Sequence, residues 1–388
     1  MDIKESKKEC CGCTACYAVC PTGAVVMRED EEGFFYPWID EEKCIHCDQC
    51  KNVCAFSADY REKLSVANRK SEQHYYVGRV KDRMIRDQSR SGGIFYALAR
   101  EIQKRDGVVY GVVMDADCRA VYERAVKVEE LHRMQGSKYV QAMKGDILHD
   151  IEKDLRNGKL VLAAGTACEI AGLLAYLQSH NVCLDQLYTV DLLCHGVPSP
   201  KIWQENIKDY EKRWKMQIGS ADFRDKSFGW KAHIESYTGR TKTGKIRKKY
   251  SNKYTSLFYA SVILRPSCHN CQFCNFDRPA DLTLGDFWGA ATTENPEIAI
   301  MGMSQIMANT NKGGKLLLEL KDVEIMEASE EDISKQPNLF APTGVSEDRS
   351  DFWKLYEEKG YHVASEKFYR VKERLKLPYN LLRRSNRR

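Results

Sequence analysis

A duplicated run of cysteines near the N-terminus constrains this chain more than any other feature. The spacing C-x2-C-x2-C-x3-C occurs twice within the first 54 residues, and each cysteine of the second run lies 34 residues after its counterpart. Three thiolates at such short intervals can wrap one corner of an iron–sulfur cubane, while the fourth turns toward a second cluster. The repeat therefore predicts a small α+β module with two 4Fe–4S clusters. Its cysteines are Cys10, Cys13, Cys16, Cys20, Cys44, Cys47, Cys50 and Cys54.

This repeat resembles the bacterial dicluster ferredoxins over residues 1–57. The resemblance implies that one cluster is bound by Cys10, Cys13, Cys16 and Cys54, and the other by Cys44, Cys47, Cys50 and Cys20. Ala55 stands where the family usually has a proline, which shapes the loop and is not a ligand. The alternative is a zinc module, but structural zinc sites usually present two C-x2-C pairs with a longer gap. Cys11 is left as a bystander.

Composition limits where the chain can act. The N-terminus is too polar for an export signal, and no uncharged apolar run of about 18 residues is present, so we expect a cytoplasmic protein with reduced thiols. The net charge of +5 is unevenly distributed: residues 1–57 carry −5, residues 370–388 carry +7, and the rest of the chain carries +3. This unevenness argues against nucleic-acid binding, and the basic tail is a candidate for peripheral contact with a membrane surface.

Apolar segments of strand and helix type alternate in the middle of the chain, which predicts an α/β domain with a mixed, partly parallel sheet. We expect a linker over residues 58–74, this domain over 75–294, and a C-terminal helical extension with a basic tail over 295–388. The expected strands cover 75–80, 108–114, 160–164 and 187–194. The expected helices cover 94–102, where Ser91 is the N-cap, and 147–155, 169–177 and 200–214.

Three turns of this domain are candidate phosphate or cofactor loops. They are Ser91-Gly92-Gly93, Gly136-Ser137-Lys138-Tyr139 and Gly165-Thr166. Strand-to-helix turns line the ligand crevice of open α/β sheets, and helix N-termini favour phosphate. Neither G-x-G-x-x-G nor G-x4-G-K-[ST] occurs, so a dinucleotide would be bound in another way. The alternative for each turn is an ordinary helix cap or surface turn.

A second group of cysteines lies far from the first. Three follow one another at x2 spacing, and two more come after strands that should end at the same edge of the sheet: Cys268, Cys271, Cys274, Cys168 and Cys194. Any four of the five could hold a third cluster, and a zinc clip is the alternative. The radical-SAM spacing C-x3-C-x2-C is absent. Cys118 and Cys183 are expected to be buried apolar thiols.

Residues 75–287 resemble the beta subunit of coenzyme F420 (deazaflavin) hydrogenases and dehydrogenases. The resemblance is carried by the three turns and the second group of cysteines, together with Cys194-His195-Gly196, Ala280-Asp281 and Gly285. Chlorophyll-cycle reductases of the 7-hydroxymethyl type share the fold. The resemblance implies FAD beside a 4Fe–4S cluster, with the three turns and Gly196 near the flavin. Relatives often keep only the first two cysteines of the C-terminal run, which favours Cys168, Cys194, Cys268 and Cys271 as ligands.

The resulting hypothesis is an iron–sulfur flavoprotein oxidoreductase. A redox partner protein or ferredoxin supplies electrons, and FAD passes them to an organic two-electron acceptor. Lys138 would offset negative charge on the flavin or its pyrophosphate, and His195 would donate a proton or, alternatively, a hydrogen bond near a cluster. The main alternative is an electron-transfer subunit without a small substrate of its own. We also expect an anaerobic host, and an oligomer is a further candidate state.

Overall fold

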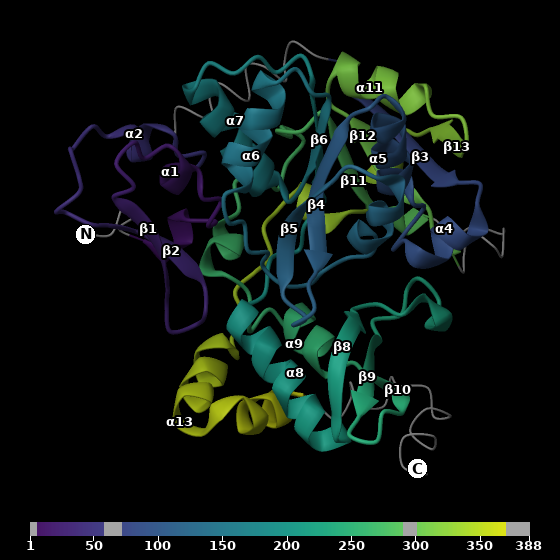
Figure 1. Cartoon of the computed structure of the whole chain (residues 1–388). Coiled ribbons are helices and arrows are strands. Elements are labelled where there is room, and N and C mark those ends of the chain that lie inside the picture. The colour runs from purple at the N-terminus through teal and green to yellow at the C-terminus, as the bar shows by residue number, and fades with distance from the viewer. Residues whose placement is uncertain (1–5, 58–71, 290–300, 370–388) are drawn as a thin grey trace.

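The computed structural model describes residues 6–57, 72–289 and 301–369. Most of the expected linker and the whole basic tail lie outside the described residues. The chain forms an N-terminal module, a central α/β body and a smaller lobe below it (Figure 1). Among the described residues, no helix combines the length and the apolar character that crossing a membrane requires.

The N-terminal module repeats its backbone as well as its cysteines. Its elements are α1 (Ala15–Ala18), β1 (Val25–Glu29), β2 (Phe35–Ile39) and α2 (Gln49–Asn52), and the two strands pair antiparallel. Positive φ values occur at Gly12 and Thr14 before α1, and again 34 residues later at His46 and Asp48 before α2. The same left-handed kinks therefore turn both cysteine loops into their helices. This confirms the predicted α+β module.

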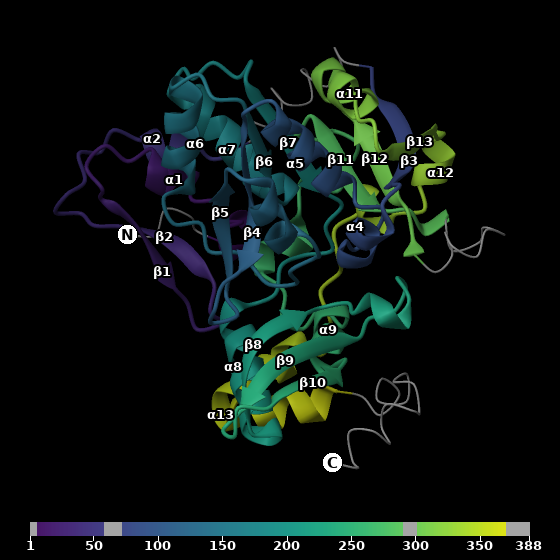
Figure 2. The ribbon, with the colours of Figure 1, turned by 45° about the vertical axis from the view of Figure 1, so that its right-hand side comes forward.

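An eight-stranded mixed sheet forms the central body, and Figure 2 shows its strands side by side. The strand order is β13-β3-β12-β11-β7-β6-β4-β5. The four inner strands β11, β7, β6 and β4 run parallel, and the outer pairings are antiparallel, which confirms the predicted partly parallel sheet. The strands are β3 (His74–Val80), β4 (Val108–Met114), β5 (Ala120–Ala125), β6 (Val161–Ala164), β7 (Leu187–Leu192), β11 (Leu282–Asp286), β12 (Ser304–Ala308) and β13 (Val323–Glu327).

Helices cover both faces of this sheet. Side chains alternate along β4, so that Val108 and Tyr110 pack with the helices α6 (Ile147–Arg156) and α7 (Ala167–Ser179), together with residues of α1. Val109 and Val113 point to the opposite face, which α5 (Ile94–Lys104) and α11 (Asn311–Leu318) cover. The N-terminal module therefore lies against the α6–α7 face. Two short helices, α4 (Arg83–Gln88) and α12 (Glu330–Ile333), complete the body.

The lower lobe has its own core around the buried Trp203. It comprises α8 (Pro200–Trp214), β8 (Met216–Asp222), β9 (Glu235–Thr241), β10 (Ile246–Ser251), α9 (Lys253–Tyr259) and α13 (Arg349–Phe368). Ser199 caps α8 by accepting a hydrogen bond from the Ile202 amide, and Pro200 occupies its first turn. The three strands form an antiparallel sheet with the order β10-β9-β8.

Four sequence expectations need correction. Gly93, in the left-handed conformation, is the N-cap of α5 in place of Ser91. The strand expected over 187–194 ends at Leu192, so that Cys194 lies in the loop beyond it. Cys183 is exposed, whereas Cys118 is buried as expected. Finally, the C-terminal region is no helical extension, because β12 pairs between β3 and β11 inside the central sheet and β13 lies at its edge. A boundary at 294 therefore falls within one sheet.

Candidate functional site

The module brings the last cysteine of one run to the first three of the other. Cys10, Cys13, Cys16 and Cys54 line one pocket, which Cys50 also reaches. Burial, together with the charges of the other three, raises the pKa of the Cys16 thiol well above its usual range. We call this group the first cysteine site. Its arrangement is the crosswise one that a two-cluster module needs.

The second cysteine site, Cys20, Cys44, Cys47 and Cys50, lies on the outer side of the module. Burial raises the pKa of the Cys50 thiol, and the charges of Cys20 and Cys47 add to the effect. Cys47 is exposed to solvent. Within the module, this second site therefore presents a thiol directly to solvent.

A third cysteine site lies at one edge of the central sheet. The strands β6 and β7 are parallel, so that Cys168, which follows β6, and Cys194, which follows β7, meet at the same edge. Cys268 lies in the 3-10 turn Pro266–Asn270, and the loop that follows carries Cys271 and Cys274. All five cysteines line one pocket.

The five thiols act on one another, since Cys274 interacts with Cys271, Cys194 and Cys268. Burial, and then the charges of Cys268, Cys168 and Cys271, raise the pKa of the Cys194 thiol well above its usual range. Burial also raises the pKa of Cys268 to about 12. Buried thiols of this kind become thiolates when a metal supplies positive charge. The donor set therefore fits a 4Fe–4S cluster, which four of these five thiolates could hold.

The first and third cysteine sites touch each other through Cys11. Its buried thiol interacts with the side chains of both Cys13 and Cys168, and Cys11 Sγ lies 3.9 Å from the Cys168 carbonyl oxygen. Cys11 belongs to an apolar cluster with Ala55, Phe56, Ala167, Ala171 and Phe273. Ala55, the residue that replaces the usual proline, is fully buried there. The cysteine that the sequence left as a bystander thus lies between two candidate clusters.

Close contact between α7 and the module requires a glycine. A Cβ atom at Gly172 would lie 2.5 Å from Cys13 Cβ and 2.7 Å from Cys13 Sγ. Polar contacts fix the same interface, since Tyr17 donates to the Asp146 carboxylate at 3.0 Å and the Gln141 amide donates to the Cys11 carbonyl at 3.0 Å. The module is therefore packed onto the body beside its third cysteine site.

In the turn Gly165-Thr166, both the amide and the hydroxyl of Thr166 donate hydrogen bonds to a side chain of the protein itself, that of Glu169. The Glu169 carboxylate accepts hydrogen bonds from the Thr166 amide (2.9 Å) and the Tyr122 hydroxyl (2.9 Å), and pairs with Lys144 Nζ at 2.7 Å. Burial opposes the charge of Glu169, but Lys144 and these hydrogen bonds outweigh it and lower the pKa of the carboxyl. This buried network holds the start of α7, and with it Cys168, at the pocket.

His195 leads from the third cysteine site into the lower lobe. Its ring lies 4.9 Å from Phe258 and 5.5 Å from Tyr259, and Nδ1 lies 3.2 Å from the Thr343 hydroxyl. Burial lowers the pKa of His195, which favours the neutral imidazole. Phe258 stacks on Tyr139 at 4.6 Å between ring centroids. The four aromatic side chains form a continuous row, which we call the aromatic row.

A group of cations lies at the far end of the aromatic row. It comprises Arg90, Lys138, Arg224 and Lys226, which we call the basic cluster. Arg224 donates to the Tyr139 hydroxyl at 3.3 Å and to Asp286 at 2.7 Å, and Arg90 pairs with Asp222 at 3.4 Å.

Two lysines of the basic cluster are poorly compensated. Burial, together with the charge of Arg90, lowers the pKa of Lys138 to about 7 and that of Lys226 to about 7. Lys226 donates to the backbone carbonyls of Arg86, Ser89 and Ser91, and Lys138 to that of Gln135 at 2.8 Å. The four cations of the cluster therefore exceed the three carboxylates that act on them, Asp87, Asp222 and Asp286, which favours an anionic ligand.

The predicted cofactor residues separate into two places. Two of the predicted turns lie at the basic cluster: Ser91-Gly92-Gly93 and Gly136-Ser137-Lys138-Tyr139. Lys226 donates to the Ser91 carbonyl, and the Lys138 side chain is itself part of the cluster. Gly165, Thr166 and Gly196 lie at the third cysteine site instead. Packing alone requires a glycine at position 92, because a Cβ atom there would lie 2.1 Å from the Gly78 carbonyl oxygen.

Sequence reasoning missed Arg90, Arg224 and Lys226. Nothing in their spacing sets them apart in a chain in which 30% of the residues are charged. Arg224 and its partner Asp286 are 62 residues apart, and only the fold joins them.

Two family models match this chain. Residues 158–334 match the C-terminal part of the beta subunit of coenzyme F420 hydrogenase/dehydrogenase, and residues 9–58 match the 4Fe-4S dicluster domain. An uncharacterized ferredoxin of Methanocaldococcus jannaschii is 36% identical over 58 residues, which are 15% of this chain and 74% of the relative. A chain of the F420-reducing NiFe hydrogenase complex from Methanosarcina barkeri, studied as a xenon derivative, is 17% identical, with a TM-score of 0.43 over 79% of this chain and 94% of that one. Residues 158–334 of this chain therefore belong to the C-terminal family of the coenzyme F420 hydrogenase/dehydrogenase beta subunit, and residues 9–58 form a 4Fe–4S dicluster domain.

Proposed function

We propose that this protein is an iron–sulfur flavoprotein oxidoreductase, in which the module and the third cysteine site serve FAD and an organic two-electron acceptor. One observation carries the proposal: the aromatic row connects the third cysteine site directly to the basic cluster. The clusters would carry single electrons, and FAD would exchange one-electron for two-electron chemistry. The family itself accounts for the oxidoreductase class.

The basic cluster supports the placement of the anionic part of FAD. Four cations face three carboxylates, Asp87, Asp222 and Asp286, and the pKa of each of the two lysines is lowered to about 7. A diphosphate between them would restore the charge balance. Gly136, where a Cβ atom would meet only the Gln88 carbonyl oxygen at 3.9 Å, leaves room for the backbone to approach such a ligand closely.

The aromatic row supports the placement of the flavin ring between the basic cluster and the cysteines. Tyr139 and Tyr259 offer planar faces, and their hydroxyls lie 3.5 Å apart beside Arg224. His195, held by Thr343, would present a neutral imidazole toward this region and orient a polar edge of the ligand. Phe56 and Phe273, in edge contact at 5.9 Å, keep water from the opposite side of the third cysteine site.

The test is anaerobic reconstitution with iron, sulfide and FAD. We expect about twelve iron atoms per chain, from three four-iron clusters, and one bound flavin. The variant Cys268→Ser should lower the iron to about eight and slow flavin reduction by a reduced ferredoxin, while the spectra of the module remain unchanged. Cys183→Ser, at an exposed cysteine away from these sites, is the matched control. Unimpaired flavin reduction in Cys268→Ser, or zinc in place of iron at the third site, would refute the relay.

A second candidate function is electron transfer to another protein, without a small-molecule substrate. The family description as a beta subunit favours it. The two candidates differ in how the reduced flavin is reoxidised. Stoichiometric reoxidation by a small acceptor such as a deazaflavin or a quinone supports the enzyme. Reoxidation only by a partner protein supports the electron-transfer role.

A further inference from the structure

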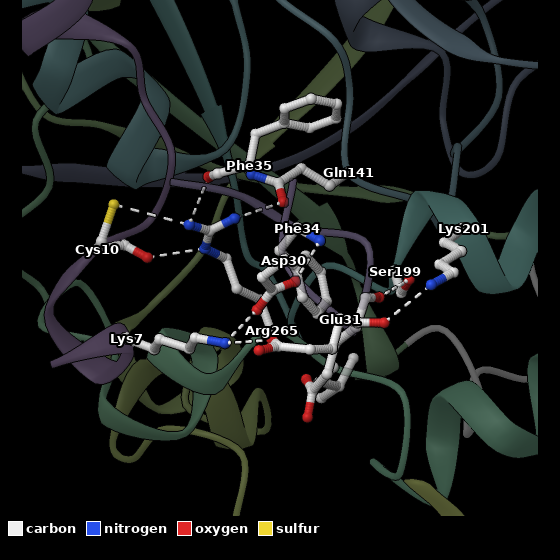
Figure 3. Close-up of polar contacts among 12 residues, drawn as sticks. Lys7, Cys10, Asp30, Glu31, Phe34, Phe35, Gln141, Ser199, Lys201 and Arg265 are labelled. Carbon is white, nitrogen blue, oxygen red and sulfur yellow. Dashed lines mark hydrogen bonds and ion pairs between the residues drawn. The ribbon is translucent and has the colours of Figure 1, made fainter. Parts of the chain in front are cut away.

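Arg265 lies at the junction of the module and the body, and none of its surface is exposed to solvent. Its guanidinium donates to the Cys10 carbonyl at 2.7 Å, to the Phe35 carbonyl at 3.0 Å and to Gln141 Oε1 at 2.9 Å. One nitrogen also lies 3.6 Å from Cys10 Sγ (Figure 3). On its other side, Arg265 lines the pocket of the third cysteine site. One side chain thus faces both sites.

Within residues 6–57, 72–289 and 301–369, no carboxylate pairs with Arg265. The acidic residues of the nearby hairpin have other partners, since Asp30 pairs with Lys7 at 2.7 Å and Glu32 pairs with Arg349. Arg278, the other buried arginine of the pocket, has its own carboxylate in Asp191 at 2.8 Å. The face of the Tyr36 ring, 4.1 Å from the guanidinium, supplies only partial compensation.

A buried cation without a counter-charge is strongly destabilising, so its compensation must come from the sites it faces. The guanidinium lies 3.6 Å from Cys10 Sγ, and Arg265 lines the same pocket as Cys268. These two cysteines are candidate cluster ligands, one in the first cysteine site and one in the third. The negative charge that balances Arg265 is therefore that of the cysteine thiolates and of the clusters that they would hold.

We propose that Arg265 is the shared counter-charge of the first and third cysteine sites, and that it raises the reduction potential of the cluster bound by Cys10, Cys13, Cys16 and Cys54. The proposal deepens the relay proposed above and rests on its ligand assignment. Arg265 acts as a positioning residue: it binds a ligand and exchanges no electron. Its charge favours the more negative, reduced state of the cluster at the first cysteine site, which we call the inner cluster. One electron that leaves the cluster at the second cysteine site, the outer cluster, is therefore held at the inner cluster, and no proton moves with it.

The experiment compares Arg265→Gln with Arg265→Lys in the full chain after anaerobic reconstitution. Redox titration followed by electron paramagnetic resonance measures the potential of each cluster separately, without reference to turnover. In Arg265→Gln, we expect the reduction potential of the inner cluster to fall. The ratio of oxidised to reduced cluster should rise by about tenfold or more, which equals about 59 mV for one electron. In Arg265→Lys, which keeps the charge, the potential should stay near that of the wild type. The outer cluster should not change in either variant.

Arg349→Gln is the matched control, because it removes the ion pair with Glu32 at the same interface and leaves the charge at the cysteines unchanged. Equal shifts in Arg349→Gln and Arg265→Gln would mean that loosening of the interface is responsible, and would overturn the proposal. So would iron-replete Arg265→Gln with an unchanged inner potential, or loss of iron in both Arg265 variants. If only Arg265→Gln loses iron, the requirement for charge is supported. Protein without bound flavin should give the same shift, so a failure to bind FAD would refute the flavoprotein and leave this inference standing.

Discussion

Replacing Gly172 with alanine tests whether the module is packed rigidly against α7. The new Cβ atom would lie 2.5 Å from Cys13 Cβ, whereas carbon atoms in van der Waals contact are about 3.5–4.0 Å apart. The module must therefore move by about 1 Å or more, and overpacking of this kind costs about 1–3 kcal/mol. Alanine also gains about 1 kcal/mol over glycine in a helix interior, which partly offsets the clash.

A second glycine separates these two contributions. Gly314 lies inside α11, and its Cβ would meet Ala308 Cβ at an ordinary 3.7 Å. Gly314→Ala should therefore show the helix gain alone. The difference in unfolding free energy between the two variants isolates the clash, at about 1–3 kcal/mol.

The assay is anaerobic denaturant unfolding of the reconstituted protein, followed by the rate at which reduced module transfers electrons to the third site. Gly172→Ala should be the less stable variant and should transfer more slowly, because the contact through Cys11 is displaced. Equal stability of the two variants would refute the close approach of α7 and the module.

Two further perturbations follow from buried charges. Glu169→Gln leaves Lys144 buried without its carboxylate and should lower the unfolding free energy by about 3–5 kcal/mol, while the double variant with Lys144→Met should recover most of the loss in the same denaturant assay; an unchanged single variant would contradict the ion pair. FAD binding should take up protons, because an anion raises the lowered pKa values of Lys138 and Lys226. Affinity should thus be constant below pH 7 and fall as the pH rises above 7, as measured by flavin fluorescence; affinity that rises with pH would contradict this placement.

The sequence predicts the parts of this protein that depend on short-range spacing. The two cysteine runs define the module, and the parallel strands before Cys168 and Cys194 place both at one sheet edge. It fails where the fold joins distant segments. β12 follows β11 in the chain and turns back to pair with β3, so that the C-terminal region completes the central sheet. Arg265 and Cys10 are 255 residues apart, and no local pattern indicates that they meet.

The second cysteine site is more exposed than the other two, and this difference bears on how the relay would work. Cys47 of the second site is exposed, whereas the first site lies against α7 and the third is enclosed by Phe56, Phe273 and Arg265. Water stabilises the more highly charged state of an exposed cluster, but a buried cluster must obtain that stabilisation from protein charges. Arg265, buried between the two inner sites, supplies such a charge where water cannot. A ferredoxin bound by a flexible linker alone would lose this arrangement, because the guanidinium comes from the body and its ligand from the module.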